Sequence, residues 1–561
     1  MKKVNKTTFA TGFHFIPLGG SEEFGINFNL YACDGKWMIF DCGIGFADHR
    51  FPGVDILLPD PAFVEEYKND ILGMVITHGH EDHVGAVPYL WPRLKCPIYC
   101  TKFTAAVLRA KMNERPDCKG AKIIEISTES ELVLDPFRFQ FIHVAHSIPQ
   151  AVSTVIETSY GRVVHSGDWN LDPTPVIDTP TDEAAFRAAG DKGILAYIGD
   201  STNAPQAGRA GTESDVVIGL EHVFAEAPGR ILITIFASNI GRIQSICRAA
   251  EKTGRSVCML GRSLHRMTSN AHQCGYLGQT QSFVSEEELP FLPSDKTVLM
   301  VTGSQGEAQA ALARIARGDW KGIKLGKGDT AVFSSKAIPG NEKDINAVKN
   351  YLSAAGVTIV DNKNSRHKVH VSGHPYRDEI ADMLSWIKPK AVIPVHGERL
   401  MLEAHANLAR DMGIETVVIP NNGSVIRLSQ EEGVEIVDHV PTHALAVEPN
   451  RVISSHHKGI AERRKLQFSG AAHVTVVLDS RGFLAATPHI TLIGMIDDTD
   501  EEDQEILEEI KQEIDDVLLE IREEEITDML RIEEDIRICI RRMLNDIFGF
   551  KPKVSVHLLR V

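Results

Sequence analysis

Residues 75–90 read VITHGHEDHVGAVPYL. This stretch holds four titratable side chains directly after a short apolar run: His78, His80, Asp82 and His83. The apolar run GMVI, residues 73–76, is typical of a buried strand, so the polar cluster begins where a strand is predicted to end. Imidazole and carboxylate groups are ligands that suit zinc or manganese, and the H-x-H-x-D-H spacing lets them face two directions from one loop. The stretch therefore predicts a metal site with room for two ions.

A different interpretation is a solvated polar loop, or a helix start whose side chains only accept hydrogen bonds from backbone N–H groups. Four ligands are too few for two metals, so further ligands should follow other strands. Three other short apolar runs end in this way, in the segments FIHVAHSIP, GRVVHSGDWNLD and AVIPVHGE, which carry His146, Asp168 and His396. Because loops on rigid strands often carry binding residues, this recurrence favours the metal site.

Length and composition place the chain among globular proteins of several domains. It has 561 residues, of which 43% are hydrophobic and 24% charged, and this length predicts two to four domains. Residues 1–15 have a basic start but no apolar core of a signal peptide, and no run is long enough to cross a bilayer. We therefore expect a cytoplasmic protein without a membrane association.

The formal net charge of −17 argues against a protein that coats nucleic acid through bulk electrostatics. A polyanionic substrate would need a local groove, and bound metal cations would supply part of the positive charge there.

The strand and helix patterns divide the chain into segments. Short strands with helices between them, from about residue 15 to 199, predict an α/β sandwich. Fully apolar strands separated by helices, from about 200 to 364, predict a parallel, doubly wound sheet. Strands and helices return over 369–426, residues 441–469 read as a connecting segment, and the last 90 residues or so read as two strands, helices and one strand. In that helical zone an apolar stripe recurs at three- and four-residue steps: Leu507, Ile510, Ile514, Val517 and Ile521.

The motifs, taken in order, resemble a known superfamily. THGHEDHVGA, HSIP, SGD and VHGE resemble the successive motifs of the metallo-β-lactamase fold. The α/β insertion before VHGE, with SGHP at 372–375, resembles the β-CASP branch of that superfamily. GGSEEFGINFNLY, DCGIGF, GDSTNA, FASN, TGSQGE, AIPGNE and HVSGH resemble the bacterial ribonuclease J family over nearly the full length.

The resemblance implies an α/β fold class: a metallo-β-lactamase αββα sandwich with an inserted β-CASP α/β domain and a small C-terminal α/β domain. The expected boundaries are 1–205 and 367–445 for the two parts of the metallo-β-lactamase domain and 206–366 for the β-CASP domain. A linker would span 446–469, and residues 470–561 would form the C-terminal domain, in which oligomerisation could take place.

The resemblance also implies roles for single residues. Two divalent ions per subunit, Zn²⁺ and/or Mn²⁺, would be held by His78, His80 and His146 on one side and by Asp82, His83 and His396 on the other, with Asp168 shared. Asp41 would orient the ligands from behind them, and His374 and Asp200 would be catalytic. The substrate-binding residues would be His370, Val371, Ser372, Gly373, His374, Ser238 and Asn239. Histidine at 396 resembles the branch members that act on RNA, whereas those that process DNA tend to have valine there.

Paired divalent ions suit phosphodiester hydrolysis because they activate water and neutralise charge on phosphoryl oxygens. His374, its ring held by Asp200, would protonate the leaving 3′-oxygen, so that products carry 5′-phosphate and 3′-hydroxyl ends. In the loop HVSGH, the Gly373 N–H, the Ser372 hydroxyl and a positive charge on His370 would suit a phosphate.

The family implies 5′→3′ exonuclease and endonuclease activity in RNA maturation and mRNA decay, with a preference for 5′-monophosphorylated RNA. It also implies a homodimer or homotetramer and membership of an RNA-degradation complex.

Simpler interpretations of these residues stay open. His374 would otherwise be a hydrogen-bonded turn residue, and Ser238, Asn239 and residues 303–306 (GSQG) would be helix caps. The chain also departs from the family at Gly241, where relatives commonly carry histidine, and at Gln150, where an acidic residue is more usual. These departures concern RNA positioning and the balance of exonuclease and endonuclease action.

Two other functions compete. A small-molecule metallohydrolase acting on lactams, thioesters or lactones would need only the metal motifs, and it leaves the insertion, SGHP and the C-terminal domain without a use. A catalytically silent RNA-binding subunit should have lost ligands, whereas all seven are present.

Overall fold

The structure is a computed structural model that describes residues 9–278, 280, 282–497 and 499–561. It contains two compact units, Met1–Gly45 with Leu58–Ala444 and Phe46–Leu57 with Leu445–Val561. Within the described residues, no helix has the length and apolar character needed to cross a membrane. Residues 1–8, part of the segment that argued against a signal peptide, lie outside the described residues.

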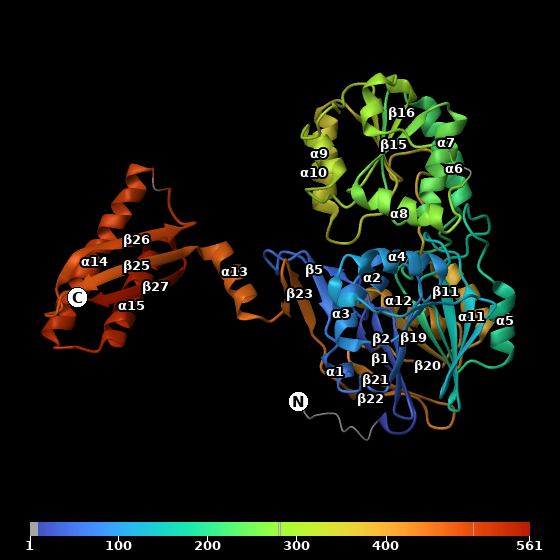
Figure 1. The fold of residues 1–561 in the computed structure, drawn as a ribbon, viewed down its shortest axis with the longest axis horizontal. Helices are drawn as coiled ribbons and strands as arrows, with labels where there is room; N and C mark the ends of the chain where they lie inside the picture. The colour runs from blue at the N-terminus through green and yellow to red at the C-terminus, as the bar shows by residue number, and fades with distance from the viewer. Residues whose placement is uncertain (1–8, 279, 281, 498) are drawn as a thin grey trace. The chain divides into compact units, whose positions relative to one another are not determined.

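The first unit is built on two packed sheets (Figure 1). The eight-stranded sheet has the order β22 (Gly433–His439), β21 (Ser424–Ser429), β1 (Phe13–Gly19), β2 (Phe28–Cys33), β3 (Lys36–Phe40), β6 (Ile71–Ile76), β7 (Ile98–Cys100) and β8 (Ile123–Glu125). The seven-stranded sheet has the order β20 (Thr416–Val417), β19 (Ala391–Val395), β13 (Ala196–Asp200), β12 (Gly161–His165), β11 (Val152–Thr158), β10 (Phe137–His143) and β9 (Glu131–Leu134). Strands from after the insertion complete both sheets, so the sandwich is one discontinuous domain.

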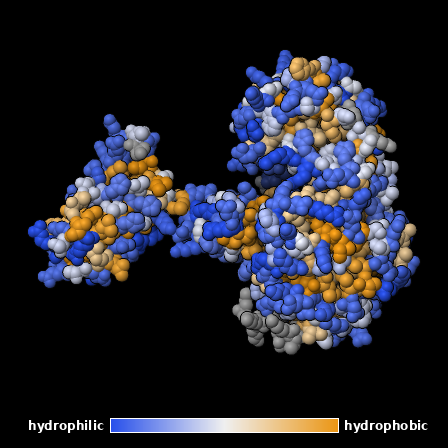
Figure 2. Space-filling view, viewed as in Figure 1, coloured by the Kyte–Doolittle hydropathy of each residue, from blue (hydrophilic) through white to orange (hydrophobic). Residues whose placement is uncertain are grey.

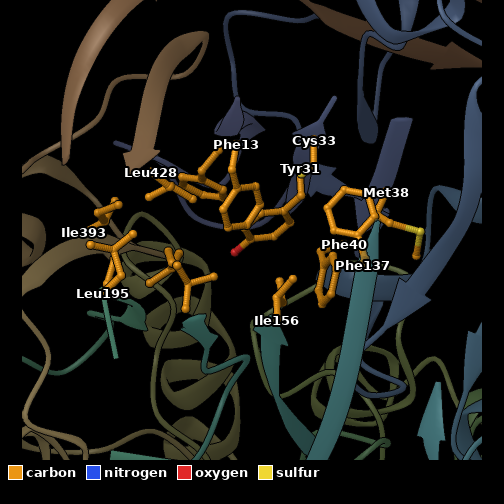
Figure 3. Packing of buried hydrophobic residues seen from close by; sticks show 14 of the residues in the cluster. Phe13, Tyr31, Cys33, Met38, Phe40, Phe137, Ile156, Leu195, Ile393 and Leu428 are labelled. Carbon is orange, nitrogen blue, oxygen red and sulfur yellow. The ribbon is translucent and has the colours of Figure 1, made fainter. Parts of the chain in front are cut away.

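The main core lies between the two sheets, where apolar side chains of both inner faces meet (Figure 3). Phe13, Tyr31 and Phe40 come from the first sheet, and Ile156 and Ile393 from the second. These strands are apolar nearly throughout because both faces are buried. The core thereby fixes the strand ends on which the polar residues sit.

Helices cover the outer faces, which completes the predicted αββα arrangement. Against the second sheet pack α5 (Glu183–Asp191), α11 (Arg377–Ile387) and α12 (Arg399–Asp411). The helices α1 (Ala62–Glu65), α2 (Glu81–Val84), α3 (Val87–Leu94) and α4 (Lys102–Asn113) follow strands of the first sheet or precede its next strand. Each of α3 and α4 buries one apolar face, as amphipathic helices in such crossovers do.

The inserted domain is a parallel five-stranded sheet, as the apolar strand pattern predicted. Its order is β15 (Ser256–Leu260), β16 (Thr297–Val301), β14 (Ile231–Thr234), β17 (Thr330–Phe333) and β18 (Thr358–Val360). Helices α6 (Glu213–Glu226) and α7 (Ile240–Lys252) lie on one side, and α9 (Ala311–Arg317) and α10 (Glu342–Ala354) on the other, with α8 (Arg262–Gln273) below them in Figure 1. Hydrophilic residues cover most of its visible surface in Figure 2.

In the second unit, the segment predicted as a linker contains regular structure. β23 (Ala444–Glu448) and β24 (Arg451–Ser454) form an antiparallel hairpin in a sheet with β4 (Gly45–Phe46) and β5 (Ile56–Pro59), and helix α13 (Lys458–Ser469) follows. The buried residue of α13 is Ile460 alone. A helix that is polar on nearly all sides gives no amphipathic stripe, which is why its sequence reads as a connection.

The C-terminal domain has the predicted order of two strands, helices and one strand. β26 (Leu484–Ile493), β25 (Ala471–Leu478) and β27 (Lys553–Arg560) form a three-stranded sheet, with α14 (Glu501–Glu523) and α15 (Met529–Phe548) between β26 and β27 in sequence. The predicted stripe on α14 enters the domain core, where Ile510, Ile514 and Ile521 are buried and Leu507 and Val517 partly buried.

Candidate metal centre

The polar residues of the motifs meet at one edge of the sandwich because each follows a buried strand. β6 leads to residues 78–83, β10 to His146, β12 to Asp168, β13 ends at Asp200, and β19 leads to His396. These side chains are buried or nearly so. Residues separated by more than 300 positions in the sequence therefore form one cluster.

Asp168 lies at the centre of this cluster. Its Oδ2 atom is 3.2 Å from the Nε2 atom of His83, 3.4 Å from that of His396, 3.6 Å from that of His78 and 3.9 Å from that of His146. Asp168 is 2% exposed, and neither carboxylate oxygen has a hydrogen-bond partner among the described residues. A buried carboxylate without hydrogen bonds is costly unless cations neutralise it. The donor set of imidazoles and carboxylates therefore fits bound divalent metal.

Three of the histidines are held by their outer nitrogens. Nδ1 of His146 donates to the Gly373 carbonyl at 2.7 Å, and Nδ1 of His396 donates to Asn27 Oδ1 at 2.9 Å. Nδ1 of His83 donates to Asp41 Oδ2 at 2.8 Å. With the outer nitrogen engaged in this way, Nε2 is the atom of each ring that faces the cluster and suits a metal.

The cluster contains three overlapping groups of ligand atoms, and all three include Asp168. The first comprises His78, His80, His146 and Asp168, the second Asp82, His83, Asp168 and His396, and the third Asp168, Asp200, His374 and His396. In each group the ligand atoms lie within 4.8 Å of one another. The first two groups are the residues that the resemblance assigned to two ions.

Electrostatics keeps several of these histidines neutral. Burial, followed by the charge of neighbouring histidines, lowers the pKa of His78 and of His80 well below its usual value. Burial lowers the pKa of His146 to about 4. Neutral imidazole is the form that binds metal, so these three histidines would release few protons on binding. His83 differs, because Asp168, Asp41 and Asp82 outweigh its burial and raise its pKa well above the usual value.

Asp41, the predicted orienting residue, lies behind the cluster and is 1% exposed. Besides His83 it binds the backbone N–H of Thr77 at 2.8 Å and the Thr77 hydroxyl at 3.0 Å. The Thr77 hydroxyl oxygen in turn lies 3.0 Å from His78 Nδ1. Thr77 therefore connects Asp41 to a second histidine, a role that the motif letters alone did not reveal.

Asn27 is a further residue that sequence reasoning missed. Its Nδ2 atom donates to the Asp82 carbonyl at 3.0 Å, while its Oδ1 atom accepts from His396. Asn27 lies in the segment GGSEEFGINFNLY, 55 residues before Asp82. Nothing in the sequence indicated that Asn27 contacts Asp82. Asn27 ties the loop after β19 to the loop after β6.

The two predicted catalytic residues form a pair. Nδ1 of His374 donates to Asp200 Oδ2 at 2.8 Å, and Asp200 is 1% exposed. Burial alone would lower the pKa of His374, but Asp200 and Asp168 raise it to about 9. The ring also stacks on that of His396, with centroids 5.5 Å apart. Within the described residues, Nε2 of His374 has no hydrogen-bond partner, so it can serve a substrate.

A small cavity lies beside the loop 370–374. The predicted substrate-binding residues Val371, Ser372, Gly373 and Asn239 line it, together with His146, Ser147 and Gly241. Asn239 also caps α7, since its Oδ1 accepts from the Arg242 N–H at 2.7 Å. Ser238 and His370 do not belong to the lining.

The two departures have different settings. A Cβ atom at Gly241 would find its nearest neighbour 3.5 Å away, so the glycine leaves room in the cavity that a side chain could fill. Gln150 instead turns to α4, where its Oε1 atom accepts from the Phe103 N–H at 2.8 Å.

The structure contradicts the positive charge expected on His370. Arg242 donates to His370 Nδ1 at 3.1 Å, so this nitrogen is unprotonated. Burial, followed by the charge of Arg242, lowers the pKa of His370 well below its usual value. Arg242 is fully buried, pairs with Glu213 at 2.6 Å and also donates to the Ser334 carbonyl at 2.8 Å. The loop 370–374 is thus supported from the β-CASP domain by a cation that cannot itself reach substrate.

Comparison with known proteins agrees with this architecture. The chain matches the family models "Beta-lactamase superfamily domain" over residues 36–182 and "Ribonuclease J, beta-CASP domain" over 228–352. It also matches "Zn-dependent metallo-hydrolase RNA specificity domain" over 362–420 and "Ribonuclease J C-terminal domain" over 458–561.

Similar relatives span the chain. A protein named ribonuclease J from Sinorhizobium meliloti is 39% identical over 98% of this chain and 97% of its own length. One from Mycolicibacterium smegmatis is 33% identical over 98% of both chains, and one from Thermus thermophilus is 36% identical over 84% of this chain and 85% of its own.

A crystal structure of a protein of unknown function from Enterococcus faecalis shares the fold, with a TM-score of 0.53 and 16% identity over 74% of this chain and all of that one. The full-length matches, taken with the metallo-hydrolase and β-CASP domains, decide the family. The chain belongs to the ribonuclease J family, a family of metal-dependent ribonucleases.

Proposed function

We propose that this chain hydrolyses RNA phosphodiesters with two divalent ions, Zn²⁺ and/or Mn²⁺, and leaves 5′-phosphate and 3′-hydroxyl ends. The observation that carries the proposal is the position of Asp168, whose Oδ2 atom is approached by four imidazole nitrogens within 3.9 Å. One carboxylate shared by two groups of ligands is the arrangement of two-metal phosphodiesterases.

The ligands divide between the ions as the first two groups do. His78, His80 and His146 hold one ion, Asp82, His83 and His396 hold the other, and Asp168 belongs to both. Asp41 orients His83, and through Thr77 it orients His78. When bound, the ions supply an activated water and positive charge for the phosphoryl oxygens.

His374 and Asp200 act on the leaving group. As the attacking oxygen bonds to phosphorus, the bond from phosphorus to the 3′-oxygen breaks, and this oxygen needs a proton. His374 donates it from Nε2, because Nδ1 is occupied by Asp200 at 2.8 Å. Asp200 fixes the tautomer and stabilises the charged ring in the state before transfer.

The cavity binds the phosphate on the 5′ side. The Ser372 oxygen accepts from Asn203 Nδ2 at 2.8 Å, so its own proton is free for a phosphate oxygen. Gly373 brings its backbone against His146, where a Cβ atom would lie 2.9 Å from the ring. Membership of the family supports a preference for a terminal 5′-monophosphate over a triphosphate at this cavity, which would allow 5′→3′ exonuclease action as well as internal cleavage.

The wider role follows from the family. We infer a function in RNA maturation and mRNA decay, in the cytoplasm, as a homodimer or homotetramer and in an RNA-degradation complex. The division at 1–205, 206–366, 367–445, 446–469 and 470–561 is part of the same proposal.

A cleavage assay tests this function. The purified chain with Mn²⁺ or Zn²⁺ should release mononucleotides from 5′-monophosphorylated RNA much faster than from the same RNA carrying a 5′-triphosphate. Mass spectrometry of the products should find 5′-phosphate and 3′-hydroxyl ends.

The two competing functions predict other results. A small-molecule hydrolase would leave RNA intact under both metals and turn over a lactam, thioester or lactone. A silent RNA-binding subunit would bind RNA and cleave neither kind of substrate. Either result would refute the proposed function.

A further inference from the structure

Lys336 is an exposed cation near the loop 370–374. It follows β17 in the β-CASP domain, and its Nζ atom donates to Asn203 Oδ1 at 2.7 Å. Within the described residues it forms no ion pair, and Asn203 is its hydrogen-bond partner. Two other cations of this domain are neutralised, Arg242 by Glu213 and Lys349 by Asp361. Burial lowers the pKa of Lys336 from its usual value, and the ammonium has two unused N–H donors.

Asn203 connects this lysine to the substrate-binding loop. Asn203 is 1% exposed, and its Nδ2 atom donates to Ser372 Oγ at 2.8 Å and to the His374 carbonyl at 3.3 Å. The ammonium is thus one buried side chain away from both Ser372 and His374. This path joins the β-CASP domain to the loop at a second point, apart from Arg242.

The backbone around Lys336 is held in place by Gln305, which belongs to the TGSQGE motif. Nε2 of Gln305 donates to the Lys336 carbonyl at 3.1 Å, and its Oε1 accepts from the Ile338 N–H at 2.8 Å. Gly306 follows with a φ of +83°, and a Cβ there would lie 2.5 Å from the backbone of Asp344. A side chain on a clamped loop loses less conformational freedom when it binds a ligand.

Among the other cations at this loop, His374 is held by Asp200 at 2.8 Å, and Lys368, two residues before the loop, lies 3.4 Å from Asp215. Arg242 is fully buried and its donors are occupied, and His370 is neutral. The net charge of −17 makes a local cation more important for a polyanion. A lysine ammonium suits a phosphate as a point charge.

We propose that Lys336 contacts an RNA phosphate beside the loop 370–374, and that Gln305 and Asn203 position it there. The inference deepens the proposed function and rests on it, because it names the residue through which the β-CASP domain holds the RNA backbone. It also gives TGSQGE a use other than capping, since Gln305 fixes the loop that carries the cation.

Three substitutions separate the charge of Lys336 from its hydrogen bond. Lys336→Gln keeps a donor for Asn203 but removes the charge, and Lys336→Arg keeps the charge. Lys321→Gln removes one exposed charge elsewhere in the same domain, with no contact to the loop or to Asn203, and is the matched control.

The measurement is kcat/KM for a short unstructured 5′-monophosphorylated RNA at a series of KCl concentrations, with the Kd for the same RNA by fluorescence anisotropy. Lys336→Gln should lower kcat/KM about tenfold, mainly through KM, since one charge-assisted hydrogen bond is lost. The slope of log Kd against log salt should fall in magnitude by about 0.7, the value for one phosphate contact of a single strand. Lys336→Arg and Lys321→Gln should keep the wild-type slope.

Two results would overturn the inference. If Lys336→Gln keeps the wild-type slope and KM, the lysine only holds Asn203. If Lys321→Gln lowers the slope of log Kd against log salt by the same amount, the effect comes from the net charge of the domain and not from a contact of Lys336. A wild-type chain that binds this RNA without cleaving it would instead refute the proposed function, and the comparison of Kd values would still decide the role of Lys336.

Discussion

At Asp168, one carboxylate oxygen lies within 3.9 Å of four imidazole nitrogens, and no described residue donates a hydrogen bond to it. Such a group is stable only if positive charge is bound beside it. The outer nitrogens of His83, His146 and His396 are already used by the protein. Ligand geometry is therefore set before any ion arrives, which lowers the entropic cost of binding.

The variants Asp82→Ala and His374→Gln should both abolish most cleavage, for different reasons. Asp82→Ala removes a proposed ligand and should lower the metal content of the purified chain. His374→Gln removes the proposed proton donor and should reduce kcat by about 10²- to 10⁴-fold with the metal content unchanged. Mass spectrometry of the metal content and measurement of kcat on the same preparations distinguish the two variants.

Circular dichroism of both variants provides the control for folding. Wild-type cleavage by Asp82→Ala would refute the ligand assignment. Metal loss in His374→Gln would show that this histidine is a ligand and not a proton donor.

At the scale of elements, the loop 370–374 receives its shape from three directions. Gly373 binds His146, Asn203 binds Ser372, and Arg242 binds His370. The β-CASP domain and the sandwich meet in this loop, so its shape depends on both.

Gly373→Ala should disturb the metal cluster through a single methyl group. The added Cβ would lie 2.9 Å from Cε1 of His146 and 3.1 Å from Ser147 Oγ. Because His146 is buried and bonded to the same residue, it must move, and we expect lower metal content and lower kcat. Gly326→Ala is the control, since its nearest neighbour would be 3.8 Å away. Full activity and metal content in Gly373→Ala would contradict this account of the loop.

Arg242→Met should destabilise the molecule by about 3–5 kcal/mol, because it leaves the Glu213 carboxylate buried without its partner. The double variant Arg242→Met/Glu213→Met should recover part of this loss, since no unpaired charge remains. Urea midpoints of the three proteins, followed by tryptophan fluorescence, measure the difference. Equal stability of the single and double variants would contradict a buried ion pair.

The sequence predicted the features that local pattern controls. Short apolar runs followed by His or Asp indicated the strand ends at residues 78–83, 146, 168 and 396, and the fully apolar strands indicated the parallel inserted sheet. Contacts set by tertiary packing were not predictable. Only the folded chain brings Asn27, Thr77 and Arg242 next to the site. The charge on His370 was predicted wrongly because Arg242, 128 residues away in the sequence, donates a hydrogen bond to it.

At the scale of the whole molecule, buried neutral histidines predict how stability depends on pH. Burial is the main cause that lowers the pKa of His14 and of His405 to about 4, from 6.5. Between about pH 4 and pH 6.5 the folded state therefore binds fewer protons than the unfolded state. Each histidine contributes stability of up to about 3 kcal/mol that is fully present above pH 6.5 and is lost as pH falls through 4.

His405→Gln should flatten this acid dependence. His405 is fully buried against Ser201, where its Nδ1 atom lies 3.0 Å from Ser201 Oγ. All five tryptophans lie in the first unit, so their fluorescence reports its unfolding alone. Between pH 4 and 6.5 the free energy of unfolding should rise with pH less steeply in the variant than in the wild type. The two slopes should differ by about 1.4 kcal/mol per pH unit. An unchanged slope would show that His405 is charged in the folded state.

The strongest single test of the account counts the ions on the active chain. The metal-free protein is titrated with Mn²⁺ or Zn²⁺, and metal per chain is measured by mass spectrometry alongside release of mononucleotides from 5′-monophosphorylated RNA. We predict that activity reaches its maximum at two ions per chain and that Asp168→Asn, which removes the shared carboxylate charge, prevents this. Full activity with one ion, or with none, would contradict the two-metal ribonuclease.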